Sequence, residues 1–379
     1  MPEGSSKLPL IDLAAQRAHL AGRIEAAIAR VIAHGRFILG PEVEALEQAL
    51  AARVGVRHAI ACASGTDALR LALLARGIGA GDAVFVPTFT FAASAEAVAQ
   101  AGAVPVLVDV GADFTMDPTS LAEAVAALRR ERALRPRAVL PVDLFGQPAR
   151  YEDILPIARA CGLFVLQDAA QSFGASWRGE PVGRQGDAAA LSFYPSKPLG
   201  AYGDGGAVLT DDDGLAARVR SLARHGLGQG GLHVRIGANS RLDTIQAAIL
   251  LARLPALDGE RAARAAIAER YAEGLAGLVG VPRARADVEH AWSCYTVSSG
   301  RRDVLAQGLA ARGIASRVYY RRPLHQHPAY ASFPRAPALP VAEALAGRVV
   351  SLPMHAYLEP DDQARIVAAL SSLMREKGA

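Results

Sequence analysis

Short apolar strands alternate with helical segments through the first two-thirds of the chain, and this pattern limits the possible folds more than any other feature. HAIAC (residues 58–62) and DAVFVP (residues 82–87) each lead through a turn of small residues into a helical stretch. Strands that are apolar along their whole length are typical of a parallel sheet covered on both faces. The pattern therefore predicts an α/β fold, with a mostly parallel sheet and helices on both faces.

The same alternation of strands and helices continues to about residue 254, and a different order of elements follows. Further strands are expected within residues 104–110, 137–146, 162–175, 187–197 and 206–210, and helices over residues 17–32, 120–130 and 151–161. A long helix over residues 257–278, a strand at 293–299 and a closing helix from Pro360 follow. We predict a large domain over residues 1–254, with an N-terminal helical segment, and a small C-terminal α+β domain over residues 255–379.

Charge and cysteine content argue against several classes of function. Lys and Arg total 41 and Asp and Glu total 37, and the basic residues are scattered, so binding of nucleic acid is not implied. Cys62, Cys161 and Cys294 are too far apart for a metal-binding pattern, and their odd number does not describe a disulfide framework. His325 and His327 have no evident third ligand. Without a targeting peptide or a bilayer-spanning apolar run, the protein is expected in the cytoplasm, with no metal and no membrane partner.

Two turns at the ends of strands offer groups that bind ligands. Ser64, Gly65 and Thr66 precede a helix, and free backbone N–H groups at a helix start suit a phosphate. Asp168 ends the strand GLFVLQD, where open α/β sheets bind their ligands, and Gln171 follows in the same turn. Each turn also has a plainer interpretation, because the first resembles an ordinary helix cap and Asp168 can cap the next helix.

The segment SFYPSKPLGAYGDGG, residues 192–206, holds Lys197 between Pro195 and Pro198 and then places four glycines within seven residues. Proline fixes backbone torsions and glycine permits unusual ones, so this turn is expected to aim the lysine in a defined direction. A lysine considered alone is most often a surface residue.

Taken together, these groups describe one ligand, pyridoxal 5′-phosphate, which combines an aldehyde, a nitrogen heterocycle and a phosphate. Lys197 can form a Schiff base with the aldehyde. Asp168 can keep the ring nitrogen protonated, so that the ring accepts electrons. Gln171 can hydrogen-bond the ring hydroxyl, and Phe89 can either stack on the ring or belong to the core.

Five segments make the chain resemble the DegT/DnrJ/EryC1/StrS family, the fold type I sugar aminotransferases that depend on pyridoxal phosphate. They are SGTDAL, PTFTFAAS, QDAAQSFGA, SFYPSKPLGAYGDGGAV and NSRLDTIQAAIL. The resemblance extends from about Ile11 to Leu370.

This resemblance implies Lys197 as the Schiff-base lysine, Asp168 as the partner of the pyridine nitrogen and Gln171 as the partner of the ring hydroxyl. The residues implied at the phosphate are Gly65, Thr66, Ser192 and, from a second subunit, Asn239. Members of the family share two active sites across a twofold interface, so a homodimer is expected.

Within the family, SFYPSKPLGAYGDGG, HVRIGANSRLDTIQAAILL and SLPMHAYL most resemble enzymes that aminate the 3-oxo group of a UDP-linked N-acetylated uronic acid. The implied substrate is UDP-2-acetamido-2-deoxy-3-oxo-glucuronate, and the implied amino donor is glutamate. Arg241 is expected near an acidic or diphosphate group of this substrate, with Tyr319, Tyr320 and His325 around the sugar.

The chain departs from its relatives just before Pro323-Leu324. Relatives usually have His-Tyr-Pro there, whereas this chain has Tyr319-Tyr320-Arg321-Arg322, so a tyrosine replaces a sugar-contacting histidine. The adjacent Arg321 and Arg322 either bind an anionic group of the substrate or are solvated.

Three alternatives stay open at this point. One is amination of a different nucleotide-linked 3-keto or 4-keto deoxyhexose, or of a ketocyclitol, in antibiotic or polysaccharide biosynthesis. Another is sugar dehydration, which Lys197 argues against because the relatives that dehydrate carry histidine in its place. The third is a non-catalytic regulatory protein of the same fold, which the joint presence of Lys197, Asp168 and Gln171 disfavours.

Overall fold

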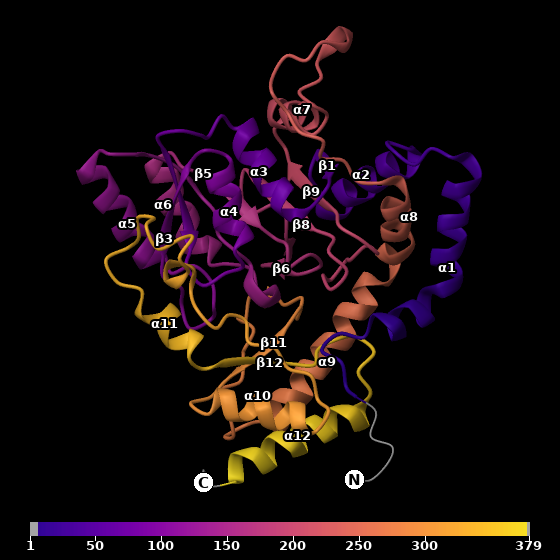
Figure 1. Ribbon diagram of the computed structural model, residues 1–379, viewed down its shortest axis with the longest axis vertical. Helices are drawn as coiled ribbons and strands as arrows, with labels where there is room; N and C mark the ends of the chain where they lie inside the picture. Colours follow the sequence, from indigo (N-terminus) through magenta and orange to yellow (C-terminus); the bar gives the residue numbers. More distant parts are fainter. Residues whose placement is uncertain (1–6, 377–379) are drawn as a thin grey trace.

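The computed structural model describes residues 7–376, and its largest feature is a seven-stranded sheet (Figure 1). Its helices are α1 (Leu13–His34), α2 (Pro41–Val54), α3 (Gly65–Ala75), α4 (Ala93–Gln100), α5 (Pro118–Glu131), α6 (Tyr151–Cys161), α7 (Asp213–Leu222), α8 (Thr244–Arg253), α9 (Leu257–Gly274), α10 (Arg302–Ala311), α11 (Pro340–Ala346) and α12 (Pro360–Arg375). Its strands are β1 (His58–Cys62), β2 (Asp82–Pro87), β3 (Val104–Val108), β4 (Arg135–Val139), β5 (Phe164–Asp168), β6 (Ser176–Trp177), β7 (Glu180–Pro181), β8 (Ala188–Ser192), β9 (Gly206–Thr210), β10 (Val288–Glu289), β11 (Tyr295–Ser298) and β12 (Val349–Leu352). Over residues 7–376, no helix has the length and apolar character needed to cross a membrane.

The large sheet has the strand order β1-β9-β8-β5-β4-β2-β3. Every neighbouring pair from β8 to β3 is parallel, whereas β9 runs antiparallel to both β8 and β1. The prediction of an α/β fold with a mostly parallel sheet is confirmed. Because β1, β5 and β8 run in the same direction, the turns that follow them meet at one edge of the sheet.

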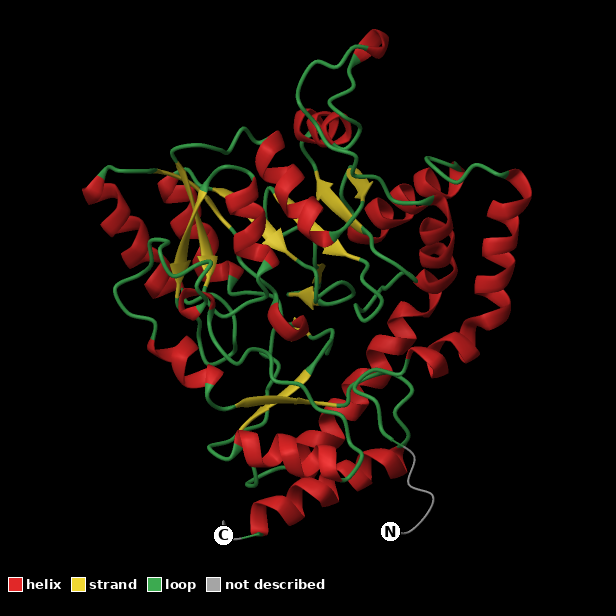
Figure 2. Cartoon of the chain, viewed as in Figure 1, coloured by secondary structure: helices red, strands yellow, loops and turns green. Residues whose placement is uncertain are grey.

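Side chains of the sheet alternate between two faces, and different helices cover each face. On one face Leu166 and Ala190 pack against α3, α4 and α7. On the other face Phe85 and Val165 pack against α5 and α6, while Leu209 packs against α2 and α8. Figure 2 shows the strands of this sheet in yellow among the red helices. Burying each of the Leu, Val and Phe side chains stabilises the fold by roughly 1.5–3 kcal/mol, so helices are packed onto both faces of the sheet.

The chain after α8 builds a second, smaller core. Strands β11 and β12 pair antiparallel and pack with α9, α10 and α12 (Figure 1). Helix α9 ends at Gly274 rather than at the predicted Leu278, and residues 275–278 form turns, because glycine is a poor helix former. Leu254, the predicted domain boundary, lies in the short 3₁₀ helix between α8 and α9. The division into two domains stays a prediction.

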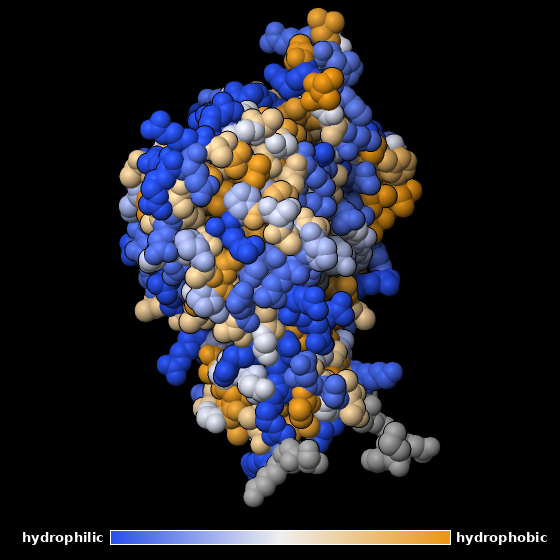
Figure 3. All heavy atoms as spheres, turned by 60° about the vertical axis from the view of Figure 1, so that its left-hand side comes forward, coloured by the Kyte–Doolittle hydropathy of each residue, from blue (hydrophilic) through white to orange (hydrophobic). Residues whose placement is uncertain are grey.

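A loop over residues 226–237, here called the arm, projects from the large sheet beyond α7 (Figure 1). Leu232, Val234 and Ile236 on the arm are exposed, and Ile236 is 95% exposed. Figure 3 shows hydrophobic residues in orange at the projecting tip. Apolar side chains gathered on an exposed projection are typical of an interaction surface.

His290 lies near the small core and is buried in a neutral form. Its Nδ1 accepts a hydrogen bond from the Trp292 backbone N–H at 2.8 Å, and the two rings stack with centroids 3.9 Å apart. Burial lowers the pKa of His290 to about 3. The unfolded chain therefore binds a proton at His290 below about pH 6.5, whereas the folded chain does not until about pH 3.

Because the unfolded state binds more protons in this window, His290 makes the protein less stable as the pH falls. From pH 7 to pH 5 we expect this residue to reduce the free energy of unfolding by about 2 kcal/mol. The His290→Asn variant keeps an acceptor for Trp292. Its free energy of unfolding should decrease from pH 7 to pH 5 by about 2 kcal/mol less than that of the wild type. Urea unfolding at both pH values tests this, with His327→Asn at an exposed position as the control. An equal fall in wild type and His290→Asn would contradict the assignment.

Candidate active site

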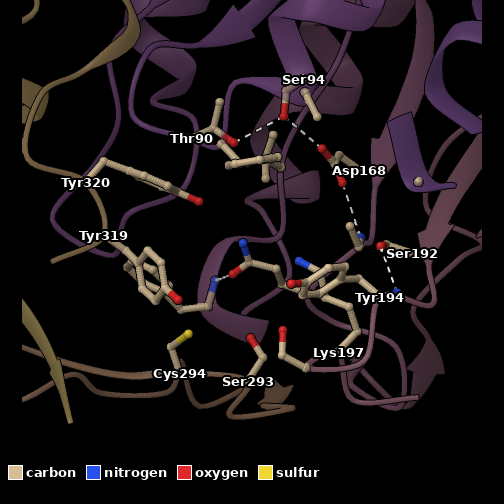
Figure 4. A pocket seen from close by; sticks show the side chains of 18 of the residues that line it. Thr90, Ser94, Asp168, Ser192, Tyr194, Lys197, Ser293, Cys294, Tyr319 and Tyr320 are labelled. Atoms are coloured by element: carbon tan, nitrogen blue, oxygen red, sulfur yellow. Dashed lines mark hydrogen bonds between the residues drawn. The ribbon is translucent and has the colours of Figure 1, made fainter. Parts of the chain in front are cut away.

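A cavity of about 490 Å³ lies at the edge of the large sheet where β1, β5 and β8 end (Figure 4). Its lining includes Leu10 from the N-terminal part of the chain and Met354 from the C-terminal part. Predicted site residues that line it are Gly65, Thr66, Asp168, Gln171, Ser192, Lys197, Tyr319 and Tyr320. Because β1, β5 and β8 run in the same direction, their ends meet at one edge of the sheet. Residues far apart in the sequence therefore share one cavity.

Asp168 is a buried carboxylate held by two hydrogen bonds. Its Oδ2 accepts from the Ser94 hydroxyl at 2.8 Å, and its Oδ1 accepts from the Ala170 backbone N–H at 3.2 Å (Figure 4). Burial raises the pKa of Asp168, while these hydrogen bonds and the charge of Lys197 oppose the shift. A buried carboxylate of this kind favours a cationic partner, such as the protonated nitrogen of a heterocycle.

Lys197 lies in the tight turn predicted from its prolines and glycines. Its backbone N–H donates to the Tyr194 carbonyl at 2.8 Å, and a Cβ atom at Gly200 would collide with the Pro195 carbonyl. Burial lowers the pKa of Lys197, and the charges of Asp168 and Cys294 oppose this. Lowering the pKa favours the uncharged amine, which is the form that attacks an aldehyde.

The start of α3 forms an anion cradle at the end of β1. The Ser64 hydroxyl accepts from the Asp67 N–H at 3.1 Å, and the Ser64 carbonyl accepts from the Ala68 N–H. These contacts leave the N–H groups of Gly65 and Thr66 without an acceptor in residues 7–376. A Cβ atom at Gly65 would lie 2.7 Å from the Ser192 Cβ, so glycine lets the helix start approach Ser192 closely.

Of the predicted ring contacts, the structure brings Gln171 to the cavity but not Phe89. The Gln171 Oε1 accepts from the Phe145 backbone N–H at 2.8 Å, and its side chain also hydrogen-bonds the Tyr320 hydroxyl at the cavity wall. Phe89 is buried in the core, with its ring edge-on to Tyr320 at 5.8 Å. Phe91, 59% exposed, lines the cavity instead. Of the two roles considered for Phe89, stacking on the cofactor ring or packing in the core, the structure shows core packing.

Three further predicted residues lie outside the cavity of their own subunit. His325 does not line the cavity: its Nδ1 lies 2.9 Å from the Thr88 hydroxyl and its Nε2 lies 3.0 Å from Glu343, so both ring nitrogens are engaged. Asn239 is exposed and Arg241 half-buried, and neither lines the cavity.

Ser94, Cys294 and Arg317 line the cavity and were not predicted. Ser94 lies within PTFTFAAS, so its position at a helix start was the available signal. Burial raises the pKa of Cys294 to about 11, and Lys197 opposes this. Cys294 and Arg317 come from the chain after α8, and no local sequence pattern marks them.

Comparison with known proteins identifies the group to which this site belongs. Residues 19–371 match the DegT/DnrJ/EryC1/StrS aminotransferase family. The chain belongs to this family. It is 43% identical over 367 residues to the UDP-2-acetamido-2-deoxy-3-oxo-D-glucuronate aminotransferase of Pseudomonas aeruginosa, which covers 96% of this chain and 100% of the relative.

Two further DegT/DnrJ/EryC1/StrS proteins are similarly close. The dTDP-3-amino-3,4,6-trideoxy-alpha-D-glucose transaminase of Streptomyces venezuelae is 44% identical over 96% of this chain and 95% of its own length. A solved structure of a family aminotransferase from Brucella abortus aligns with a TM-score of 0.96 at 50% identity, over 97% of this chain and 100% of that chain. The predicted fold type I architecture, pyridoxal phosphate cofactor and sugar aminotransferase class are confirmed by this membership.

The residues around the cavity fit the family's cofactor. Two free N–H groups at the start of α3 suit its phosphate, the buried Asp168 suits its ring nitrogen, and the half-buried Lys197, whose pKa burial lowers, suits its aldehyde. Among residues 7–376, no group of three or more His, Cys, Asp or Glu side chains is arranged to hold a metal ion.

Proposed function

We propose that this protein transfers an amino group from glutamate to the 3-oxo group of UDP-2-acetamido-2-deoxy-3-oxo-glucuronate. The observation that carries the reaction is the cavity that half-buried Lys197 and buried Asp168 share, beside an anion cradle. The sugar is supported by 43% identity over the full length of the Pseudomonas aeruginosa relative.

Each side chain has a distinct task in this proposal. When bound, pyridoxal phosphate supplies a ring that accepts electrons from the Cα–H bond of an amino acid. Lys197 would hold the aldehyde of the cofactor, and its free amine would move a proton at the Cα of the amino donor. Asp168 would accept a hydrogen bond from the ring N–H, and Gln171 would donate to the ring hydroxyl. Gly65, Thr66 and Ser192 bind the phosphate.

The ketosugar is proposed to enter the same cavity beside Tyr319 and Tyr320, which line it. The Streptomyces venezuelae relative, named for a dTDP-linked 3-amino sugar, gives the second candidate because it is 44% identical. Neither candidate uses His325 at the sugar, since Thr88 and Glu343 occupy its ring nitrogens.

The sugar is tested by running the second half of the reaction in reverse. Holoenzyme is mixed with UDP-linked 3-amino uronate or with dTDP-linked 3-amino deoxysugar, and conversion to the pyridoxamine form is followed by absorbance. Our proposal predicts fast conversion with the uronate and at least about tenfold slower conversion with the deoxysugar. Faster conversion with the deoxysugar would reject the uronate.

We further propose a homodimer in which Asn239 reaches the phosphate of the partner subunit, with the protein in the cytoplasm. The exposed apolar residues of the arm, which ends just before Asn239, support an interface there. Cys62, Cys161 and Cys294 are unpaired, which suits a reducing compartment.

Mixed dimers test the shared site. If Asn239 acts across the interface, a dimer of one Lys197→Ala and one Asn239→Ala subunit contains one intact site, so about half of wild-type activity is expected. Each variant alone should be strongly impaired. Activity in the mixture no higher than in the separate variants would contradict an Asn239 contribution from the partner.

A further inference from the structure

We propose that Arg317 binds a carboxylate group of the substrate in the cavity, an inference that rests on the proposed aminotransferase function. Only two basic side chains among residues 7–376 line this cavity, Lys197 and Arg317. Lys197 is committed to the cofactor, so Arg317 is the remaining cation that the same subunit offers to an acidic substrate in this cavity.

The backbone holds Arg317 at the cavity wall. Its N–H donates to the Ser351 carbonyl at 3.1 Å, and the Ser351 N–H donates back to the Arg317 carbonyl at 2.7 Å. Ser351 belongs to β12 and also lines the cavity. In an extended segment alternate side chains share a face, and here Arg317 and Tyr319 line the cavity while Val318 between them packs against the core.

The Arg317 guanidinium has no carboxylate partner within 4.0 Å in the described chain. The cavity wall includes two acidic residues, Asp168 and Asp204, and neither pairs with Arg317. Asp168 accepts hydrogen bonds from Ser94 and Ala170, and Asp204 makes no ion pair with Arg317 over residues 7–376. An exposed guanidinium at a cavity wall, with its five donors unpaired by acids, suits a planar carboxylate.

Neighbouring arginines are poorer candidates for this task. Arg321 is paired with Asp303 at 3.2 Å and lies outside the cavity, as does Arg322. Arg241 lies outside the cavity of its own subunit and would reach a site only across the proposed dimer interface, as Asn239 would. Burial raises the pKa of the nearby Tyr319 hydroxyl while the charge of Arg317 opposes the shift, in agreement with a guanidinium close to that sugar-facing tyrosine.

Two substrates of the proposed reaction carry carboxylates, namely the amino donor and the uronate sugar. Binding to the holoenzyme separates them when it is measured by calorimetry with three unreactive probes. UDP-glucuronate and UDP-glucose differ in the sugar carboxylate, and glutarate represents the dicarboxylate of the donor. The variant is Arg317→Met, which removes the charge but keeps a long apolar stem.

We expect Arg317→Met to lower the binding affinity for at least one of the two acidic probes by roughly 10-fold to 100-fold. Weakening of UDP-glucuronate with UDP-glucose unchanged assigns Arg317 to the sugar, and weakening of glutarate assigns it to the donor. Arg317→Lys should recover part of the lost affinity. The matched control is Arg348→Met. Arg348 is an exposed arginine just before β12, and it does not line the cavity.

The proposal is overturned if neither acidic probe weakens by more than about threefold, or if UDP-glucose weakens as much as UDP-glucuronate and glutarate is unchanged. Failure of the proposed function has a different outcome. A wild-type holoenzyme that binds neither nucleotide sugar rejects the UDP-linked substrate, while the glutarate measurement still decides the role of Arg317.

Discussion

Replacing Lys197 with alanine lowers the rate of amino transfer by at least about 10⁴-fold in our account. The variant loses both the amine that holds the aldehyde and the base that moves the proton from Cα. Burial lowers the pKa of this lysine and so favours its uncharged amine. An exposed lysine lacks this effect, so it should not replace Lys197. The measurement is the single-turnover conversion of the bound cofactor by glutamate, followed by absorbance.

The sequence offers a matched control, because it contains three lysines, Lys7, Lys197 and Lys377. Lys7 is exposed and does not line the cavity. Lys7→Ala should transfer amino groups at the wild-type rate. A rate for Lys197→Ala within about tenfold of wild type would show that another group carries the proton.

Asp168→Asn should give the second largest loss, about 10²-fold to 10³-fold in the same half-reaction. The amide keeps the shape of the side chain and an acceptor for Ser94, but it no longer balances the charge of a protonated ring nitrogen. Cofactor binding should weaken far less than the rate, because the phosphate cradle and Lys197 are unchanged. Both quantities are measured on the variant, as rate and as cofactor dissociation constant.

Ser94→Ala is the control that separates charge from position. It removes one hydrogen bond to the Asp168 Oδ2 and leaves the carboxylate in place, so a smaller loss of about tenfold is expected. If Asp168→Asn were no slower than Ser94→Ala, the carboxylate charge would not be the important property.

Much of the large sheet and cofactor site was predictable because their signals are local. Each strand is a short apolar run, and the turns carrying Gly65, Asp168 and Lys197 directly follow strands or contain prolines and glycines. Parallel strands then bring these turns to one edge, so knowing the sheet type was enough to group the residues.

The missed features depend on contacts between distant segments. β6, β7 and β10 have two residues each, too few for a periodic pattern, and they form a sheet across more than one hundred positions. Phe89 and His325 have residue types that suit a site, yet packing against Tyr320 and hydrogen bonds to Thr88 and Glu343 direct them elsewhere. Arg317 reaches the cavity only through its pairing with Ser351.

Reduction of the holoenzyme with borohydride tests the central claim most directly, because it fixes the cofactor to whichever amine holds it. Peptide mass spectrometry then identifies the modified residue among the three lysines of the sequence. We predict the phosphopyridoxyl mass on Lys197 and on neither Lys7 nor Lys377. An unmodified Lys197 peptide from protein with bound cofactor would contradict the account.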